Sequence, residues 1–324
     1  MLQTKRSLCR LVAGTLMMGA SLGAVAQDFP NKPIRIIVSF GAGSIADLVA
    51  RTIGGGMTKV LGQPIIVESR TGASGLVAYE YVARQVPADG YTIALGDSSM
   101  AILPLFVKDT RIDLQRDLPP FSVVIDMRLL LVAPSSTGWN NYAEMVSHAK
   151  ANPGKLNFGV FGLQTPAALG AEVIKQKNNL NYALVPYKGG AAEVRAAVLA
   201  SQVELATYTT GMAAADGDKV KLLGISGERR LPAFPNVPTF TELGIGDFDG
   251  IFLTLHAPAA TPRPIVDRLY SAASAALKMP EVSGPLVKLG FNPEGSTPEA
   301  AAKRMADLLK TNLEIARKAG IKPE

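Results

Sequence analysis

Residues 34–47 read Ile-Arg-Ile-Ile-Val-Ser-Phe-Gly-Ala-Gly-Ser-Ile-Ala-Asp, and this stretch decides the fold class of the chain. Its first five residues are mostly apolar and predict a buried strand, a small-residue turn follows, and a helical pattern begins near Ser44. Gly41 and Gly43 allow the backbone to turn sharply, and the first N–H groups of a helix have no partner within it. Because such a turn binds anions readily, the sequence predicts an anion site at residues 40–44.

The rest of the chain repeats this alternation of strand and helix, with short connections between them. A second strand–turn–helix unit covers residues 155–177 and matches the first in form rather than in its residues. This alternation is typical of parallel sheets whose faces are covered by helices, so we expect an α/β fold with two lobes and a mostly parallel sheet in each. Further strands are expected at residues 64–68, 91–95, 122–132, 182–186, 203–207, 221–225 and 251–255, and a long final helix at residues 298–318.

The first 26 residues match a secretory signal peptide. Three basic residues precede an apolar run over residues 11–25, and Ala-Val-Ala at residues 24–26 fits a cleavage site between small residues. We expect the mature chain to start near Gln27 and to be exported to the periplasm. An uncleaved membrane anchor is the alternative, although the run is short and rich in Gly and Ala for a bilayer span.

The composition excludes several classes of function. Cys9 is the single cysteine and belongs to the predicted leader, so the mature chain would contain no disulfide, catalytic thiol or thiolate metal ligand. The formal net charge of +6 falls to +3 once the three basic residues of the leader are removed. Because the remaining basic residues are scattered among acidic ones, we expect no nucleic-acid partner.

A dinucleotide site is the sharpest alternative to an anion-binding receptor. Gly41-x-Gly43-x-x-Ala46 follows a predicted strand and opens a predicted helix, and Glu68 ends the next strand. This is the arrangement of a Rossmann cofactor site, which would make the protein an NAD-dependent oxidoreductase. Against it, the predicted leader places the protein where free nicotinamide cofactors are scarce.

Other catalytic chemistry has little support in the sequence. His148 and His256 are the only histidines, and neither has a metal-ligating partner at a suitable spacing. Ser74 and Ser226 lie between glycines but lack the spacing of a nucleophile elbow. We therefore expect no enzyme activity, no metal and no cofactor.

Three polar or small-residue loops follow predicted strands, at residues 40–44, 97–99 and 162–165. Ligands of open α/β sheets gather at the carboxyl ends of strands. Because the three loops are distributed over two lobes, the sequence favours a shared cleft that binds an anion.

Motifs along the whole mature chain show that it resembles the Bug-type periplasmic receptors of tripartite tricarboxylate transporters. The resemblance implies two α/β lobes joined by crossing strands and closing on a small organic acid, with the C-terminal segment returning to the first lobe. We expect the first lobe at residues 27–125 and 251–324 and the second at residues 126–250. The motifs are Phe29-Pro30-x-Lys32-Pro33-Ile34-Arg35, Ala46-Asp47-x-Val49-Ala50-Arg51, Leu61-Gly62-Gln63-Pro64, Asp89-Gly90-Tyr91-Thr92, Asn152-Pro153-Gly154-Lys155-Leu156, Val185-Pro186-Tyr187-Lys188-Gly189, Pro235-Asn236-Val237-Pro238-Thr239 and Ala257-Pro258-Ala259.

The resemblance also implies where the ligand is held. In that family, backbone N–H groups and waters of the loop that matches residues 40–44 hold the first carboxylate of the ligand, and two further loops assist. The expected site residues are Phe40, Gly41, Ala42, Gly43, Ser44, Asp97, Ser98, Ser99, Phe161, Gly162, Leu163, Gln164, Thr165, Tyr208 and Thr209.

This chain departs from the family pattern at the site. The usual Pro-Pro-Gly-Gly turn is Gly-Ala-Gly-Ser at residues 41–44, and a Ser-Ser-Gly-Asn-Gly-Thr loop becomes Val-Phe-Gly-Leu-Gln-Thr at residues 160–165. An acidic residue and Asn are replaced by Tyr208-Thr209. A hydroxyl-rich ligand would leave polar atoms unpaired against Phe161 and Leu163, at a cost of about 1–3 kcal/mol for each group.

We therefore expect an aromatic or apolar-bodied carboxylate, with a terephthalate-like diacid as one candidate. The negative charge of Asp97 would repel a second carboxylate of the ligand unless the Asp97 side chain points away from it. The expected partners are the ligand and the membrane subunits of the transporter, and the protein is expected to act as a monomer. A receptor that feeds a sensor kinase is an alternative output for the same site.

Overall fold

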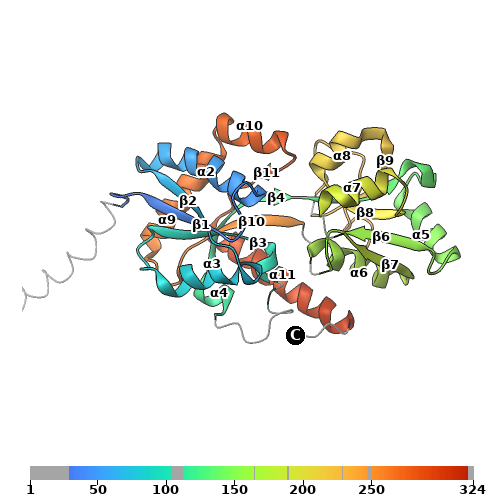
Figure 1. Ribbon diagram of the computed structural model, residues 1–324, viewed down its shortest axis with the longest axis horizontal. Helices are drawn as coiled ribbons and strands as arrows, with labels where there is room; N and C mark the ends of the chain where they lie inside the picture. The colour runs from blue at the N-terminus through green and yellow to red at the C-terminus, as the bar shows by residue number, and fades with distance from the viewer. Residues whose placement is uncertain are drawn as a thin grey trace, which may run out of the picture.

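The computed structural model describes residues 29–101, 103, 112–163, 165–187, 190–227, 229–246 and 250–319. The predicted signal peptide and Gln164 of the predicted site lie outside the described residues. Figure 1 shows two α/β units side by side along the long axis, and we call them the first and second lobe. Within the described residues, no helix combines the length and apolar character needed to cross a membrane.

The first lobe is built on a six-stranded sheet in the order β11-β4-β10-β3-β1-β2. β1 is parallel to β2 and β3, whereas β10 is antiparallel to both β3 and β4. The strands are β1 Ile34–Val38, β2 Ile65–Ser69, β3 Thr92–Asp97, β4 Pro120–Met127, β10 Ile251–His256 and β11 Asn292–Pro293.

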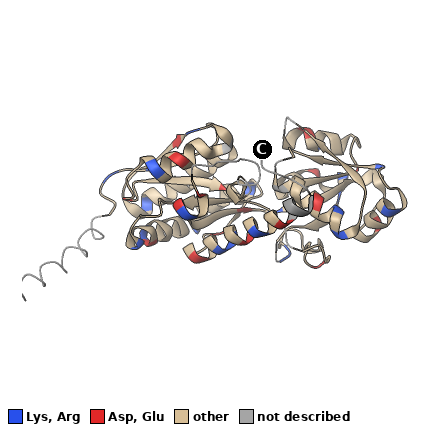
Figure 2. Cartoon of the chain, turned by 90° about the horizontal axis from the view of Figure 1, so that it is seen from below, with Lys and Arg blue, Asp and Glu red and all other residues tan. Residues whose placement is uncertain are grey.

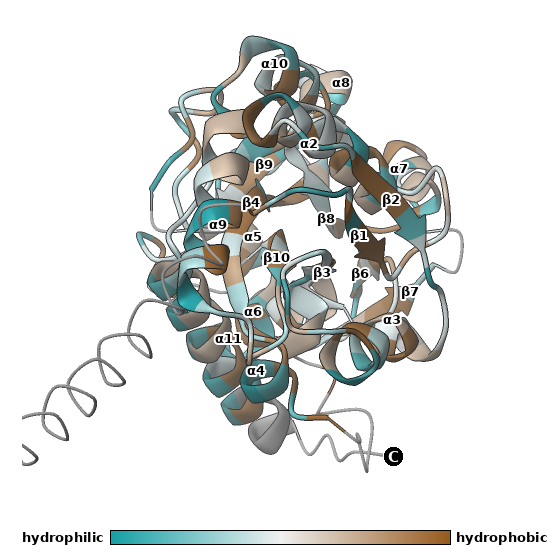
Figure 3. Cartoon of the chain, turned by 90° about the vertical axis from the view of Figure 1, so that its left-hand side faces the viewer, coloured by the Kyte–Doolittle hydropathy of each residue, from teal (hydrophilic) through white to brown (hydrophobic). Residues whose placement is uncertain are grey.

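Helices cover both faces of this sheet. One face packs against α2 (Ile45–Leu61), α9 (Arg263–Leu277) and α10 (Pro280–Lys288). The other face packs against α3 (Leu76–Glu80), the turn η2 (Tyr81–Gln85), α4 (Leu114–Asp117) and α11 (Pro298–Ala319). Figure 3 looks along the long axis with the first lobe in front and shows the apolar character of β1 at its centre.

The second lobe is built on a five-stranded sheet in the order β7-β6-β8-β5-β9. α5 (Tyr142–Ala151) and α6 (Pro166–Asn178) cover one face, and α7 (Ala191–Leu199) and α8 (Thr210–Asp216) cover the other. The strands are β5 Leu129–Pro134, β6 Leu156–Val160, β7 Tyr182–Pro186, β8 Leu205–Thr209 and β9 Val220–Ile225, and the short helical turns of the chain include η1 Ala73–Gly75, η3 Ser98–Ala101, η5 Ser135–Thr137 and η6 Gly217–Lys219.

The structure confirms the expected α/β fold, but the sheets are mixed rather than mostly parallel: three of the five neighbouring strand pairs of the first sheet and two of the four of the second are antiparallel. β11 was not among the expected strands, and two expected strands differ from the structure. The apolar run at residues 122–132 is two strands, β4 and β5, which belong to different sheets and meet at Arg128. The strand expected at residues 203–207 is β8, two residues further along, so Tyr208 and Thr209 lie inside the strand rather than after it. The expected lobe boundaries at residues 125/126 and 250/251 stay predictions.

α2 shows how local sequence signals set a helix. Ser44 is its N-cap, and the Ser44 side chain accepts a hydrogen bond from the N–H of Asp47. The helix ends at Gly62, which adopts the left-handed conformation with φ 70°. Gly56 allows close packing against α9 and α10, since a Cβ at this position would lie 2.7 Å from the Cβ of Ala276.

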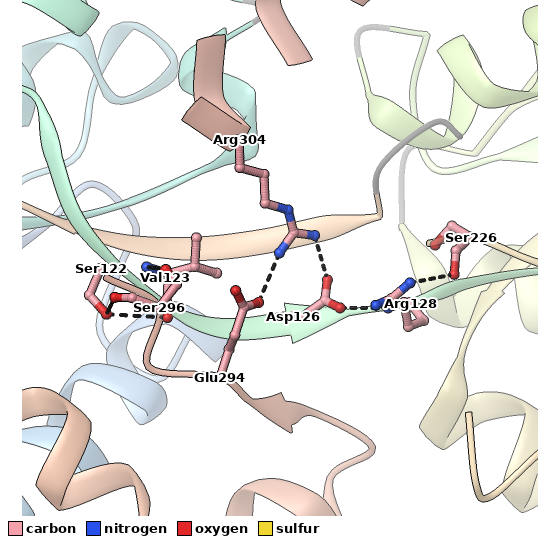
Figure 4. Close-up of polar contacts among 8 residues, drawn as sticks. All are labelled: Ser122, Val123, Asp126, Arg128, Ser226, Glu294, Ser296 and Arg304. Carbon is pink, nitrogen blue, oxygen red and sulfur yellow. Dashed lines mark hydrogen bonds and ion pairs between the residues drawn. The ribbon is translucent and has the colours of Figure 1, made fainter. Parts of the chain in front are cut away.

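A chain of charged groups ties the crossing between the lobes to the C-terminal helix (Figure 4). Asp126 is 1% exposed, and its carboxylate accepts hydrogen bonds from Arg128 at 2.5 Å and from Arg304 of α11 at 2.9 Å. Arg304 also donates to Glu294 at 2.9 Å, and Arg128 donates to the carbonyl of Ser226 at 2.9 Å. This network therefore joins both segments that pass between the lobes, because Arg128 follows β4 and Ser226 follows β9.

The lobes also touch away from this crossing. The hydroxyl of Thr210, at the start of α8, donates to the carbonyl of Gly290 in the turn after α10. α11 belongs to the first lobe but reaches α6 of the second (Figure 1). Figure 2 shows Lys and Arg interspersed with Asp and Glu over both lobes.

Candidate functional site

The carboxyl ends of the parallel strands in the two lobes face each other. In the first lobe, β10 leads away from the second lobe, β3 is antiparallel to β10, and β1 is parallel to β3. In the second lobe, β5 leads away from the first lobe, β8 is antiparallel to β5, and β6 is parallel to β8. The loops that follow β1, β3, β6 and β8 therefore lie at the facing ends of the two sheets, where ligands of α/β folds bind.

Strand register places two predicted site residues close to the crossing. Asp97 is paired with Leu253, which lies two residues beyond Ile251, the partner of Met127 at the end of β4. Thr209 is paired with Leu129 at the start of β5. Asp97 and Thr209 thus end their strands on opposite sides of Arg128.

In the loop after β1, some backbone N–H groups donate hydrogen bonds within the chain and others do not. The N–H of Gly43 donates to Asp47 at 3.0 Å, and the N–H of Ser44 donates to the carbonyl of Gly41 at 3.1 Å. In the described part of the chain, no hydrogen bond uses the N–H groups of Gly41, Ala42, Ile45 or Ala46. The groups able to hold an anion are therefore those of Gly41 and Ala42 together with the first turn of α2.

The carboxylate of Asp47 holds this loop in place by accepting a hydrogen bond from the N–H of Gly43. Its carboxylate is buried and accepts two hydrogen bonds from Arg51, at 2.9 and 3.0 Å, in addition to the one from Gly43. The Arg51 guanidinium and then the Gly43 N–H lower the pKa of Asp47 below its ordinary value. The negative charge of Asp47 is thus neutralised by Arg51, which leaves the start of α2 favourable for an anion.

The last residue of β3, Asp97, places a carboxylate beside the first loop. Asp97 is 8% exposed, and one of its oxygens, Oδ1, accepts both the N–H of Ser99 at 2.8 Å and the hydroxyl of Ser99. Burial raises the pKa of Asp97 above its ordinary value. Ser98 is fully buried, and its hydroxyl has no partner among the described residues.

Two residues that the sequence analysis did not assign to the site complete this polar group. The hydroxyl of Tyr79, from α3, lies 3.1 Å from that of Ser39, which precedes Phe40. Both side chains are buried, and burial together with the nearby charge of Asp97 raises the pKa of Tyr79. Ser39 could have been noticed beside the first loop, whereas Tyr79 lies in an apolar helical segment that gives no such signal.

The loop after β6 presents apolar side chains. Leu163 is 55% exposed, and Phe161 is half-buried against the core of the second lobe. Thr165 is the N-cap of α6, and its hydroxyl donates to the carbonyl of Gly162 at 2.8 Å. In the first lobe, Phe40 is 39% exposed at the facing end of β1. Apolar surface is thus available at the facing ends of both lobes.

The two residues at the end of β8 differ in their surroundings. Tyr208 is fully buried in the core that contains α7, and its hydroxyl donates to the carbonyl of Arg195 at 3.4 Å. Burial and the charge of Asp216 raise its pKa. Thr209 is half-exposed and caps α8 by accepting from the N–H of Met212. Tyr208 therefore packs the core in this conformation, and its contact with a ligand stays a prediction.

The residues that a dinucleotide site or a histidine-based site would need make contacts within the fold. Glu68, the acidic residue at the end of the second strand, forms an ion pair with Arg35 at 3.5 Å. His256 is buried, with Nδ1 2.9 Å from the carbonyl of Leu118 and Nε2 2.6 Å from the hydroxyl of Thr254. Among the described residues, no group of three or more His, Cys, Asp or Glu side chains could hold a metal ion.

Comparisons with known proteins agree on one family. The family model described as tripartite tricarboxylate transporter family receptor matches residues 49–321. The chain is 34% identical to a UPF0065 protein of Bordetella pertussis, over 98% of this chain and 99% of that protein.

Solved structures show the same fold. The periplasmic binding protein BugD has a TM-score of 0.70 and 28% identity, covering 91% of this chain and all of BugD. Rpa4515 of R. palustris, solved with adipate, has a TM-score of 0.73 and 27% identity, covering 92% of this chain and all of Rpa4515.

Proposed function

Because the chain belongs to the tripartite tricarboxylate transporter receptor family, we propose that it is a periplasmic receptor for a small carboxylate with an aromatic or apolar body. It would deliver this ligand to the membrane subunits of a transporter, and it would act as a monomer. A signal peptide at residues 1–26 would bring it to the periplasm. The observation that supports the ligand class is the combination of open N–H groups after β1 with exposed apolar side chains after β1 and β6.

The carboxylate end of the ligand would bind the first lobe. Hydrogen bonds to a charged group contribute about 1.5–3 kcal/mol each, and Gly41, Ala42 and the first turn of α2 offer several such donors. Backbone donors do not require a charged side chain, so a single carboxylate would be held without a buried cation.

The body of the ligand would bind between Phe40 of the first lobe and Phe161 and Leu163 of the second. Each square ångström of apolar surface removed from water contributes roughly 25 cal/mol, so an aromatic ring gains more here than a hydroxylated chain. A terephthalate-like diacid is one candidate within this class. Whether it binds depends on Asp97, whose negative charge would disfavour a second carboxylate nearby.

Ligand binding would select a closed form of the two lobes. The crossing at Arg128 and Ser226 is the natural pivot, because the chain passes between the lobes there. A ligand that contacts both lobes favours the closed arrangement by its additional contacts, and the membrane partner would recognise that arrangement.

The substitution Phe161→Ser tests the ligand class. We expect the wild-type protein to bind benzoates more tightly than C4–C6 aliphatic diacids, and Phe161→Ser to reduce this preference about tenfold, because the ring loses its apolar partner. Isothermal titration calorimetry gives the two affinities, after a thermal-shift screen of both groups of acids.

Leu199→Ser is the matched control. Leu199 is 38% exposed but ends α7, on the side of the sheet away from the facing ends. Its substitution is expected to leave the preference unchanged. An unaltered ratio of affinities in Phe161→Ser would contradict the proposed ligand class.

A further inference from the structure

Asp97 differs from the other buried carboxylates of the described chain. Asp47, Asp126 and Asp216 are each at most 4% exposed, and each is paired with at least one arginine: Arg51, Arg128 with Arg304, and Arg195 respectively. Asp97 is 8% exposed, and within the described residues no arginine, lysine or histidine forms an ion pair with it.

One oxygen of Asp97 is also open. Both hydrogen bonds from Ser99 go to Oδ1, and Oδ2 accepts none from the described residues. A buried carboxylate that lacks a donor for one oxygen is costly, so a donor from outside the chain would be stabilising there.

The position of Asp97 places its carboxylate beside the proposed ligand site. β1 and β3 are parallel with Val38 paired to Leu95, so Asp97 is level with Phe40 at the start of the anion-binding loop. Through Tyr79, the polar group around Asp97 also contacts Ser39 at the base of that loop. A molecule held by the N–H groups of Gly41 and Ala42 would therefore have Asp97 as its neighbour.

We propose that Asp97 is a specificity-determining residue that selects carboxylates bearing an ammonium, amide or hydroxyl donor and excludes those bearing a second carboxylate. This inference rests on the proposed carboxylate-binding function and narrows it. The donor of the ligand supplies Oδ2 with its missing partner, whereas a second carboxylate meets a like charge in a poorly solvated site. The apolar body still packs between Phe40 of the first lobe and Phe161 and Leu163 of the second.

The test uses pairs of probes that differ in one group. Phenylalanine and benzylmalonate share a benzyl body and a carboxylate, and they place an ammonium or a second carboxylate next to it. The pair 4-(aminomethyl)benzoate and terephthalate places the same two groups at the far end of the ring. We expect the wild-type protein to prefer the ammonium member of at least one pair by tenfold or more, measured by isothermal titration calorimetry.

The substitution Asp97→Asn removes the charge and keeps an oxygen that accepts from Ser99. It is expected to reduce that preference at least tenfold, mainly by improving the affinity for the diacid. Asp267→Asn is the control, since it removes a charge from the exposed surface of α9, and it should leave the preference unchanged.

The outcomes separate the two proposals. A preference of the wild-type protein for the diacid of both pairs overturns the role of Asp97, even if Asp97→Asn does not fold. An equal preference in the wild-type protein and Asp97→Asn also overturns it, while the measured binding supports the carboxylate receptor. If neither these probes nor the benzoates and aliphatic diacids bind the wild-type protein, the proposed function fails, and the inference fails with it.

Discussion

At the scale of single residues, His256 makes the stability of the protein depend on pH. A carbonyl oxygen can only accept, so Nδ1 of His256 carries the proton donated to Leu118, and Nε2 accepts from Thr254. Burial lowers the pKa of His256 to about 4, from an ordinary value of 6.5. The unfolded chain therefore binds a proton more readily between these pH values, and the stabilisation present above pH 6.5 is lost as the pH falls toward 4.

The substitution His256→Gln should remove this dependence. Between pH 7 and pH 5 we expect the wild-type protein to lose about 2 kcal/mol more unfolding free energy than the variant. Urea unfolding at both pH values measures it. Asp97 acts in the opposite direction, because burial raises its pKa, but it is present in both proteins. His148 is the other histidine of the chain and is exposed, so His148→Gln should retain the wild-type dependence.

At the scale of helices and strands, Gly56 decides how closely α2 approaches α9 and α10. A methyl group there would lie 2.7 Å from the Cβ of Ala276 and 2.8 Å from a methyl group of Val282. We expect Gly56→Ala to destabilise the protein by about 1–3 kcal/mol, because the helices must move apart. Chemical denaturation measures the change.

The neighbouring glycine provides the control for this prediction. Gly55 is exposed in the same helix, and a Cβ there would meet nothing within 4 Å. Gly55→Ala should be neutral or should stabilise the protein by up to about 1 kcal/mol, through helix propensity alone. If Gly56→Ala were no less stable than Gly55→Ala, helix propensity rather than close helix packing would control this position.

Most secondary-structure elements were predictable because their signals are local. The strand at residues 34–38, its turn and the helix that follows carry an apolar run, glycines and a serine cap, and all three appear where they were expected. The expected lobe boundary at residues 125/126 lies inside the run at residues 122–132, but the division of this run into β4 and β5 was not predictable, because the residues on both sides of the crossing are mostly apolar. Asp126 and Arg128 are the polar residues at the crossing. Their ion-pair network includes Arg304, which lies 176 residues beyond Arg128 and therefore could not be assigned from the local sequence.

The candidate site was predictable to a similar extent. The loops after β1, β3 and β6 follow from strand ends, which the sequence shows directly. The burial of Tyr208 could not be predicted from the sequence, because the strand was expected to end before this residue. The missing partner of Asp97 was not visible either, since it depends on which side chains the fold brings to the end of β3.

At the scale of the whole molecule, α11 contacts both lobes. It packs on the sheet of the first lobe and also reaches α6 of the second. Arg304 anchors it at the crossing, where the guanidinium contacts Asp126 and lies 4.2 Å from the centre of the Phe252 ring. Arg304 therefore links the C-terminal helix to the pivot about which the lobes would close.

The substitution Arg304→Met tests this anchoring role. It leaves the buried carboxylate of Asp126 with Arg128 as its remaining arginine, and breaking a buried ion pair costs about 3–5 kcal/mol. Because Arg128 remains, we expect a loss near the lower end, about 3 kcal/mol, in urea unfolding. Lys303→Met changes the adjacent, exposed residue of α11 and should cost less than about 0.5 kcal/mol. A loss in Arg304→Met no greater than in Lys303→Met would mean that the helix is held by its apolar face alone, through Ala301, Met305 and Leu308.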